Sequence, residues 1–426
     1  MKAFTVGLLG MTLFAAPALA YQEGAAPDAR PAAKAPALAF KGGRWFDGER
    51  FIPAVWYSVG GRFTARRPAR IDATIDLTGR YVMPPLAEAH NHDAQSSYTA
   101  ARSLDKYLSQ GIFYSVQLCT RPDQVKDFNE FVNRPATLDI NFSGACITSS
   151  DGHPLSLAAA SGYEGKTPEE YRLNWEVIDT YPDVDRVWAR VAERKPDIVK
   201  LIIVNSEKFA ESRQKPELFG LNGMDPALVA PIVERAHRDG IRVAVHADSG
   251  FDFATAVAAG ADFVAHLPGY RFAKDMDRAA YRIPDAAIEE AARRRVAVMT
   301  TANVAGYYLS RNPGDKQELQ AIQSDNLRRL RAAGVSLVLG SDNFNATVID
   351  EIMYLDALNV MPRAELLRRA VMDTSRAIFP KRRIGGFGEG MEASLVAYES
   401  NPIDDLERLR SPVLRVKQGS LLGHAR

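Results

Sequence analysis

Eight short apolar runs, separated by longer segments with helical periodicity, constrain the fold of this chain more than any other feature. Runs of this length and composition are typical of buried β-strands, and strands that alternate with helices form parallel sheets. Eight such units are the number that closes a (β/α)₈ barrel. The sequence therefore predicts an α/β fold with a TIM-type (β/α)₈ barrel, and an open doubly wound parallel sheet is the alternative. The strand candidates are residues 86–92, 112–118, 140–147, 198–204, 243–247, 263–267, 296–300 and 336–341.

Both ends of the chain carry a different pattern, in which short apolar runs alternate with glycine-containing turns, as in small antiparallel strands. We expect residues 37–83 and 381–426 to combine into one small β-sandwich domain beside the barrel, which would occupy residues 84–380. Residues 21–36 are rich in Ala and Pro, a composition typical of an extended linker. The longest connection of the barrel region, residues 155–185, is interpreted as a lid or excursion after the third strand.

The amino terminus has the form of a secretory signal peptide. Lys2 is followed by an uncharged run that ends in Ala18-Leu19-Ala20, the small-x-small pattern of a cleavage site. We therefore expect residues 1–20 to be cleaved after Ala20 and the mature protein to be periplasmic or secreted. An uncleaved membrane anchor is the alternative, because the run could nearly span a bilayer. No later stretch is long and apolar enough to span one, so no stable membrane insertion is expected after cleavage.

The two cysteines, Cys119 and Cys146, could form a single disulfide in an oxidising compartment. Each lies in an apolar, strand-like run, where a free cysteine packs as a small hydrophobe. The sequence favours two free, buried cysteines over a disulfide.

The charge balance indicates the class of partner. Lys and Arg number 53 and Asp and Glu 52, and loss of Lys2 with the signal peptide lowers the formal net charge from +1 to zero. Such a chain has no basic field to hold nucleic acid or an acidic membrane. We expect a small-molecule substrate and no nucleic acid, and the sequence leaves a homo-oligomer open.

Polar side chains close several of the apolar runs. His90 and His92 are one residue apart at the end of the first strand candidate, so the period of a strand places both imidazoles on one face. His246, His266 and Asp342 each follow an apolar run at the corresponding place. The carboxyl ends of all strands meet at one mouth of a parallel barrel, which would gather these side chains. Neutral imidazole and carboxylate are ligands for divalent ions such as zinc, so the pattern predicts a metal site.

Lys200 lies inside the apolar run 198–204, where an unpaired ammonium would carry a large desolvation penalty. One interpretation is that Lys200 faces outward and reaches water. The other is that it points into the mouth as a metal ligand, which requires a neutral amine or a carbamate formed with carbon dioxide.

The order of these motifs resembles that of the amidohydrolase superfamily, and more narrowly its branch of imidazolonepropionases and Xaa-Pro dipeptidase-like enzymes. The resemblance covers about residues 40–419. It differs at Glu88, where the family usually has Asp, and at Glu392-Ala393-Ser394-Leu395, where Ala-Asp-Leu is common. The matching motifs are Met83-Pro84-Pro85 with Glu88-Ala89-His90-Asn91-His92, residues 236–246 ending in His246, residues 258–266 ending in His266, Leu339-Gly340-Ser341-Asp342, and the closing segment 384–402.

The resemblance implies a hydrolase that activates water with one or two divalent metals, zinc by default. Asp342 would also accept the proton of the attacking water and return it to the leaving group. The loop Ser149-Ser150-Asp151-Gly152-His153-Pro154, after the third strand candidate, resembles a Gly-Gly-His segment of the dipeptidase-like branch. We expect His153 to bind substrate, with a loop histidine of no role as the alternative. In the binuclear case the ligands would be His90, His92 and Asp342 for one metal, His246 and His266 for the other, and carbamylated Lys200 as the bridge.

Three functions are compatible with these residues. The first is a binuclear hydrolase of amide (C–N, non-ester) bonds in small peptides or N-acyl amino acids, which Lys200 and the His153 loop favour. The second is a mononuclear enzyme of the same fold that opens a cyclic amide or deaminates a heterocycle, using His90, His92, His246 and Asp342. The third, a non-catalytic barrel scaffold, is disfavoured because every ligand position is filled.

Overall fold

The computed structural model describes residues 35–94, 97–120, 132–158 and 175–423. The predicted signal peptide, nearly all of the predicted linker and residues 159–174 of the predicted lid lie outside these ranges. No helix within the described ranges is long and apolar enough to cross a membrane.

Every one of the eight strand candidates contains a strand, and all of these strands lie in two parallel sheets. The smaller sheet has the order β10-β9-β8 and the larger the order β12-β11-β13-β14-β15-β16-β17. Because helices cover their faces, the strands are almost continuously buried and apolar. Their bounds are β8 Leu86–Asn91, β9 Ile112–Gln117, β10 Asp139–Phe142, β11 Cys146–Thr148, β12 Trp175–Val177, β13 Ile198–Ile202, β14 Arg242–His246, β15 Phe263–Ala265, β16 Ala297–Met299 and β17 Ser336–Val338.

The third strand candidate departs from the prediction. It is divided into β10 and β11, with Gly144 between them at a φ of 62°. β12, which the sequence analysis assigned to the long connection, adds a strand parallel to β11. Glycine adopts positive φ at no steric cost, and this permits the bend between the two halves.

Backbone hydrogen bonds join the two parallel sheets. The amide of Ala89 in β8 donates to the carbonyl of Leu339 beyond β17 (2.9 Å), and the amide of Asp342 donates to the carbonyl of His90 (2.8 Å). The amide of Asp197, just before β13, donates to the carbonyl of Phe142 at the end of β10 (3.0 Å). The first and last strand candidates therefore lie side by side.

Helices follow the strands in the alternation that the sequence predicts. Asp225 caps the turn that precedes α7, accepting a hydrogen bond from the amide of Ala227. Ser249 caps α8, and Asp252 completes its capping box. The longer helices are α1 Ser97–Ser109, α5 Tyr181–Arg194, α7 Val229–Arg238, α8 Gly250–Ala258, α9 Asp285–Arg294, α11 Lys316–Ala332 and α12 Val348–Ala357, with the shorter α3 Leu155–Ala158, α6 Phe209–Ser212, α10 Ala305–Leu309, α13 Arg363–Arg368 and α14 Thr374–Ile378.

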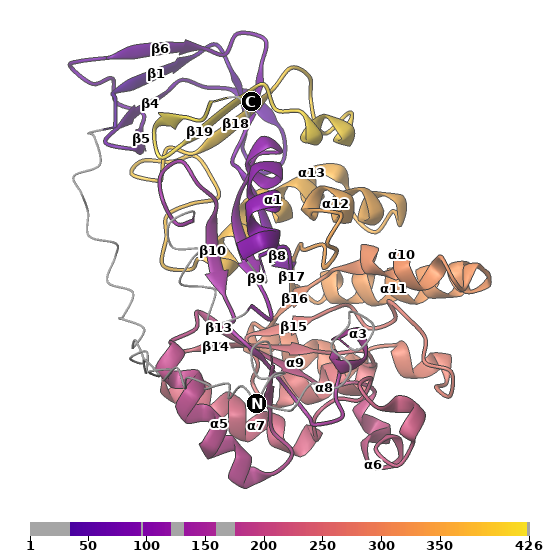
Figure 1. Cartoon of the computed structure of the whole chain (residues 1–426). Helices are drawn as coiled ribbons and strands as arrows, with labels where there is room; N and C mark the ends of the chain where they lie inside the picture. The colour runs from indigo at the N-terminus through magenta and orange to yellow at the C-terminus, as the bar shows by residue number, and fades with distance from the viewer. Residues whose placement is uncertain (1–34, 95–96, 121–131, 159–174, 424–426) are drawn as a thin grey trace, which may run out of the picture.

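Strands from both ends of the chain form two further sheets, which lie together at one side of the parallel strands (Figure 1). One has the order β5-β4-β1-β6 and the other β20-β19-β18-β7-β2-β3, in which β18 pairs antiparallel with β7. A separate apolar core that includes Phe40, Trp45 and Leu395 lies among these strands. The bounds are β1 Leu38–Lys41, β2 Arg44–Phe46, β3 Phe51–Pro53, β4 Trp56–Val59, β5 Arg62–Thr64, β6 Ala73–Asp76, β7 Tyr81–Met83, β18 Leu395–Tyr398, β19 Leu414–Lys417 and β20 Ser420–Leu421.

A buried ion-pair cluster attaches this β-module to the parallel strands. Lys417 at the end of β19 is fully buried, and its Nζ lies 2.7 Å from Oδ1 of Asp139 at the start of β10. Arg382 contacts the other oxygen of Asp139, also at 2.7 Å. Because Asp139 is the first residue of β10, this cluster lies at the amino-terminal end of the strand and not at its carboxyl end.

Cys119 and Cys146 form a disulfide, so the prediction of two free cysteines is wrong. As expected, both side chains are buried among apolar residues, which include Trp175 and Ile202. The prediction failed because it treated each run separately. The backbone turns at Cys119, which has a φ of 51°, and this brings its Cα within 4.7 Å of that of Cys146 on β11.

The disulfide generates a stability prediction. Replacing both Cys119 and Cys146 by Ala should lower the free energy of unfolding by about 3 kcal/mol, because the cross-link closes a loop of 27 residues and restricts the unfolded chain. Denaturant titration of the variant and of the oxidised and reduced wild-type protein measures the difference. Equal stability of the oxidised and reduced protein would contradict the prediction.

Candidate metal centre

The side chains that the sequence predicts as ligands come from the carboxyl ends of four strands and from the middle of a fifth. His90 belongs to β8, with His92 just beyond it, and His246 is the last residue of β14. His266 follows β15 and Asp342 lies beyond β17, and both have left-handed backbone conformations, with φ of 82° and 47°. Such conformations are uncommon for residues other than glycine and cluster at functional sites.

Asp342 lies at the centre of the group. Its Oδ1 is 2.9 Å from Nε2 of His92 and 3.3 Å from Nε2 of His90, and its Oδ2 is 3.6 Å from Nδ1 of His266. His90, His92 and Asp342 each offer a ligand atom within 4.8 Å of the others. Two imidazoles and a carboxylate at this spacing could share one divalent ion.

The remaining histidines continue the cluster. The ring centroid of His266 lies 4.6 Å from that of His90 and 4.4 Å from that of His246. The ring of His153, which follows β11, lies 5.4 Å from that of His246. The structure therefore brings His153 and all four strand-end histidines to one site.

Lys200 also points into the structure rather than outward. It is 2 % exposed, and its Nζ has no hydrogen-bond partner. Lys200 is paired with Ala244 across β13 and β14, two residues before His246. Its charge interacts with His90, His266 and Asp342. The alternative that Lys200 reaches water is excluded by its burial.

Two of the histidines form hydrogen bonds through their ring nitrogens. Nδ1 of His92 lies 3.0 Å from the carbonyl of Leu118, and Nδ1 of His266 lies 2.8 Å from Oγ1 of Thr301. A neutral ring that donates from one nitrogen presents a lone pair on the other. The carbonyl of Leu118 can only accept, so this contact directs Nε2 of His92 to the centre. Nδ1 of His266 is close to both Oγ1 of Thr301 and, at 3.6 Å, Oδ2 of Asp342. Both nitrogens of His90 are buried without a hydrogen bond.

Burial sets the protonation of the site. It lowers the pKa of the His90, His153, His246 and His266 imidazoles, so these rings are neutral at neutral pH. It also lowers the pKa of Lys200 to about 7. Burial alone would raise the pKa of Asp342, but the neighbouring imidazoles and the Lys200 ammonium outweigh it and hold the pKa below its usual range. Neutral imidazoles and an ionised carboxylate are the forms that bind divalent metal.

Glu88 connects β8 to the segment beyond β17 that carries Asp342. Its Oε1 accepts hydrogen bonds from the amides of Ser341 (2.8 Å) and His90 (3.2 Å), and its Oε2 accepts one from the hydroxyl of Ser341 (2.9 Å). Burial raises its pKa to about 8. Gly340 permits the close approach, because a Cβ there would lie 2.6 Å from the amide nitrogen of His90. The sequence marked Glu88 only as a departure from the family.

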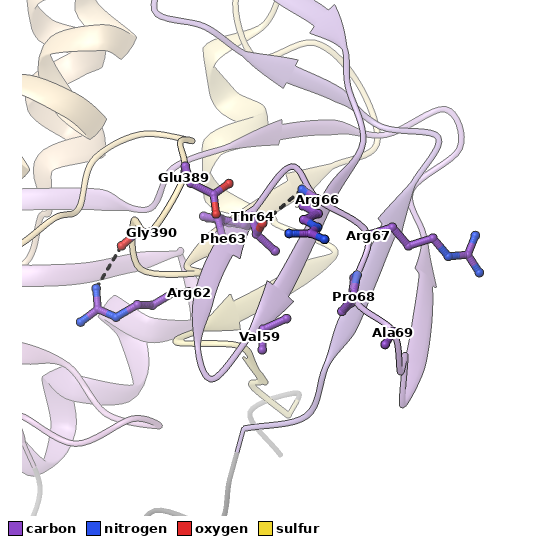
Figure 2. A pocket seen from close by; sticks show the side chains of 10 residues that line it. All are labelled: Val59, Arg62, Phe63, Thr64, Arg66, Arg67, Pro68, Ala69, Glu389 and Gly390. Atoms are coloured by element: carbon purple, nitrogen blue, oxygen red, sulfur yellow. Dashed lines mark hydrogen bonds between the residues drawn. The ribbon is translucent and has the colours of Figure 1, made fainter.

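His237 and the cavity of the β-module both lie away from the candidate metal centre. His237 precedes β14, and its Nε2 is 3.0 Å from Oδ2 of Asp262. A cavity of about 600 Å³ lies in the β-module, where Arg62 donates from Nη1 to the carbonyl of Gly390 at 3.0 Å (Figure 2). Its lining contains no histidine, so it is separate from the candidate metal centre.

Comparison with known proteins identifies the family. The sequence profile of the amidohydrolase family matches residues 203–418, half of the chain. The chain belongs to the amidohydrolase family. Members of this family are metal-dependent hydrolases of C–N bonds, so this amidohydrolase is an enzyme of that class. No curated protein matches the sequence.

Solved structures share the fold of this amidohydrolase at low sequence identity. A Xaa-Pro dipeptidase with bound methionine aligns with a TM-score of 0.69 and 18% identity, over 90% of this chain and 99% of that chain. The ochratoxinase of A. niger aligns with a TM-score of 0.72 and 18% identity, over 91% and 96% of the two chains. A molinate hydrolase aligns with a TM-score of 0.67 and 16% identity, over 92% and 95%.

The geometry generates a prediction about metal content. Replacing His92 by Ala should weaken metal binding by more than the roughly 10–100-fold typical of losing an outer contact, because it removes a ligand. Replacing His237 by Ala, at the other end of β14, should leave metal content unchanged. Elemental analysis of the two variants after identical zinc loading measures this, and equal metal in both would contradict the assignment.

Proposed function

We propose that this amidohydrolase hydrolyses the amide bond of a small peptide or an N-acyl amino acid. The observation that carries the proposal is the convergence of four strand-end histidines, a buried lysine and an ionised aspartate. Similar structures support the substrate class, since they include a Xaa-Pro dipeptidase with bound methionine and a prolidase complexed with n-methylphosphonate-L-proline.

The proposed scaffold is a closed (β/α)₈ barrel. The hydrogen bonds from Ala89 to Leu339 and from Asp342 to His90 support closure, because they connect β8 with the segment beyond β17. The bond from Asp197 to Phe142 supports continuity between the two parallel sheets. A closed barrel gives all eight strands one common mouth.

The proposed metal is zinc, and the residues present would hold two ions per chain. His90, His92 and Asp342 would hold one ion, and His246 and His266 would hold the other. Carbamylated Lys200 would bridge them, because the protonated ammonium would repel both cations whereas a carbamate is an anion with two oxygen ligands. A bound divalent metal lowers the pKa of water and polarises the scissile carbonyl.

Asp342 would move the proton. It is ionised, and its Oδ1 lies 3.3 Å from Nε2 of His90 and 2.9 Å from Nε2 of His92. The carboxylate can accept a proton from the attacking water and deliver it to the amide nitrogen as the C–N bond breaks. His153 would hydrogen-bond the substrate, which its neutral ring and its position 5.4 Å from the ring of His246 support.

The proposed location is outside the cytoplasm, either periplasmic or secreted. The signal-like sequence of residues 1–20 supports it. The disulfide between Cys119 and Cys146 supports it as well, because disulfides persist in oxidising compartments and are rare in the cytosol.

A second candidate is a mononuclear enzyme that opens a cyclic amide or deaminates a heterocycle. The observation that favours it is the spacing of His90, His92 and Asp342, the one set of histidine, cysteine or acidic side chains in the described ranges that could hold a metal at this spacing. One metal per chain and full activity without Lys200 would distinguish this enzyme from the binuclear one.

The proposed reaction can be tested with a substrate screen. Zinc-loaded protein in bicarbonate should hydrolyse members of a panel of dipeptides and N-acyl amino acids, with lactams and lactones as comparison. Replacing Asp342 by Asn should lower kcat/KM by roughly 10²–10⁴-fold, the usual effect of losing a general acid or base. Asp262→Asn, remote from the site, is the control. Protein that takes up no zinc and is inert toward the whole panel would contradict the proposal.

The pKa of Lys200 generates a pH prediction. Carbamylation requires the neutral amine, whose fraction rises as the pH passes through about 7. Binding of the second zinc should therefore increase from pH 6 to pH 8 in the presence of bicarbonate. Titration with zinc at each pH, with and without bicarbonate, measures the stoichiometry. Lys200→Ala should bind at most one zinc at any pH, and a second zinc in this variant would rule out the bridge.

A further inference from the structure

A buried carboxylate that the sequence analysis did not single out lies directly behind His246. Asp248 follows His246 by two residues, and its side chain is 1% exposed. Oδ1 of Asp248 is 3.0 Å from Nε2 of His246. This nitrogen therefore points to the carboxylate, and Nδ1 of His246 is the one left to face the metal centre.

The charge of Asp248 is compensated on its other side. Oδ2 accepts hydrogen bonds from Nη2 (2.5 Å) and Nε (3.1 Å) of Arg271, and the hydroxyl of Tyr270 donates to Oδ1. The amide of Asp248 donates to Oδ2 of Asp252, the residue of the α8 capping box (3.0 Å). The carboxylate is thus fixed by its backbone and by two side chains from the loop after β15.

Arg271 could in principle bind a substrate carboxylate instead. However, both its Nε and one terminal nitrogen already contact Asp248. A cation in this arrangement stabilises the buried anion beside it. The contacts therefore favour Arg271 as the counter-charge of Asp248.

We propose that Asp248 is a positioning residue that holds His246 in the tautomer and orientation required to bind the second metal through Nδ1. This inference rests on the proposed binuclear site. A carboxylate that accepts the outer N–H of a ligating imidazole fixes the ring and makes its other nitrogen a stronger donor, and loss of such a partner typically costs about 10–100-fold in metal affinity. Tyr270 and Arg271 act through Asp248.

The test is zinc affinity, measured by competition with a chromophoric chelator. Asp248→Asn keeps the shape of the side chain but removes its charge, and it should weaken the second zinc by about 10–100-fold while leaving the first unchanged. Asp262→Asn is the matched control, because the His237–Asp262 contact has the same 3.0 Å separation outside the site. Its zinc affinity should equal that of the wild-type protein.

A second variant covers a failure to fold, because Asp248→Asn leaves the Arg271 cation buried without its partner. The double variant Asp248→Asn/Arg271→Met removes both charges and should show the same weakened second zinc, with circular dichroism to verify the fold. Wild-type affinity for both zinc ions in either folded variant would overturn the positioning role. Wild-type protein that binds no second zinc would instead contradict the binuclear function itself.

Discussion

The cost of burying polar groups governs the carboxyl ends of the parallel strands. His90, Lys200 and His246 are buried where apolar residues fill the rest of the sheets, and each would be unfavourable there alone. Asp342 lies beside them and stays ionised, because the hydrogen bond with His92 and the Lys200 cation favour its charged form. A divalent cation is the partner that such a set of ligands fits, and membership of the amidohydrolase family agrees with that chemistry.

The rest of the fold keeps this cluster in place. Glu88 and Gly340 hold the first strand against the segment that carries Asp342, within 2.8 Å at the Ser341 amide. Lys417 and Asp139 attach the β-module at the opposite end of the strands. The attachment of the β-module is therefore separate from the candidate metal centre, which lies at the carboxyl ends of the strands.

Local patterns predicted most of the fold and the candidate ligands. The eight apolar runs contain the strands, and their last residues mark the site, because the position of a side chain at a strand end depends on the strand period and direction. The division between β10 and β11, the added strand β12 and the disulfide were missed, since each depends on how neighbouring strands meet.

The sequence by itself determined which residues end the strands, the balance of charge and the order of the family motifs. Only the tertiary structure decided that Lys200 is buried, that Asp248 lies behind His246, and that Cys119 pairs with Cys146. The reason is physical. Strand period and composition act over a few residues, whereas burial, hydrogen-bond partners and protonation depend on atoms that only packing brings within a few ångströms of each other.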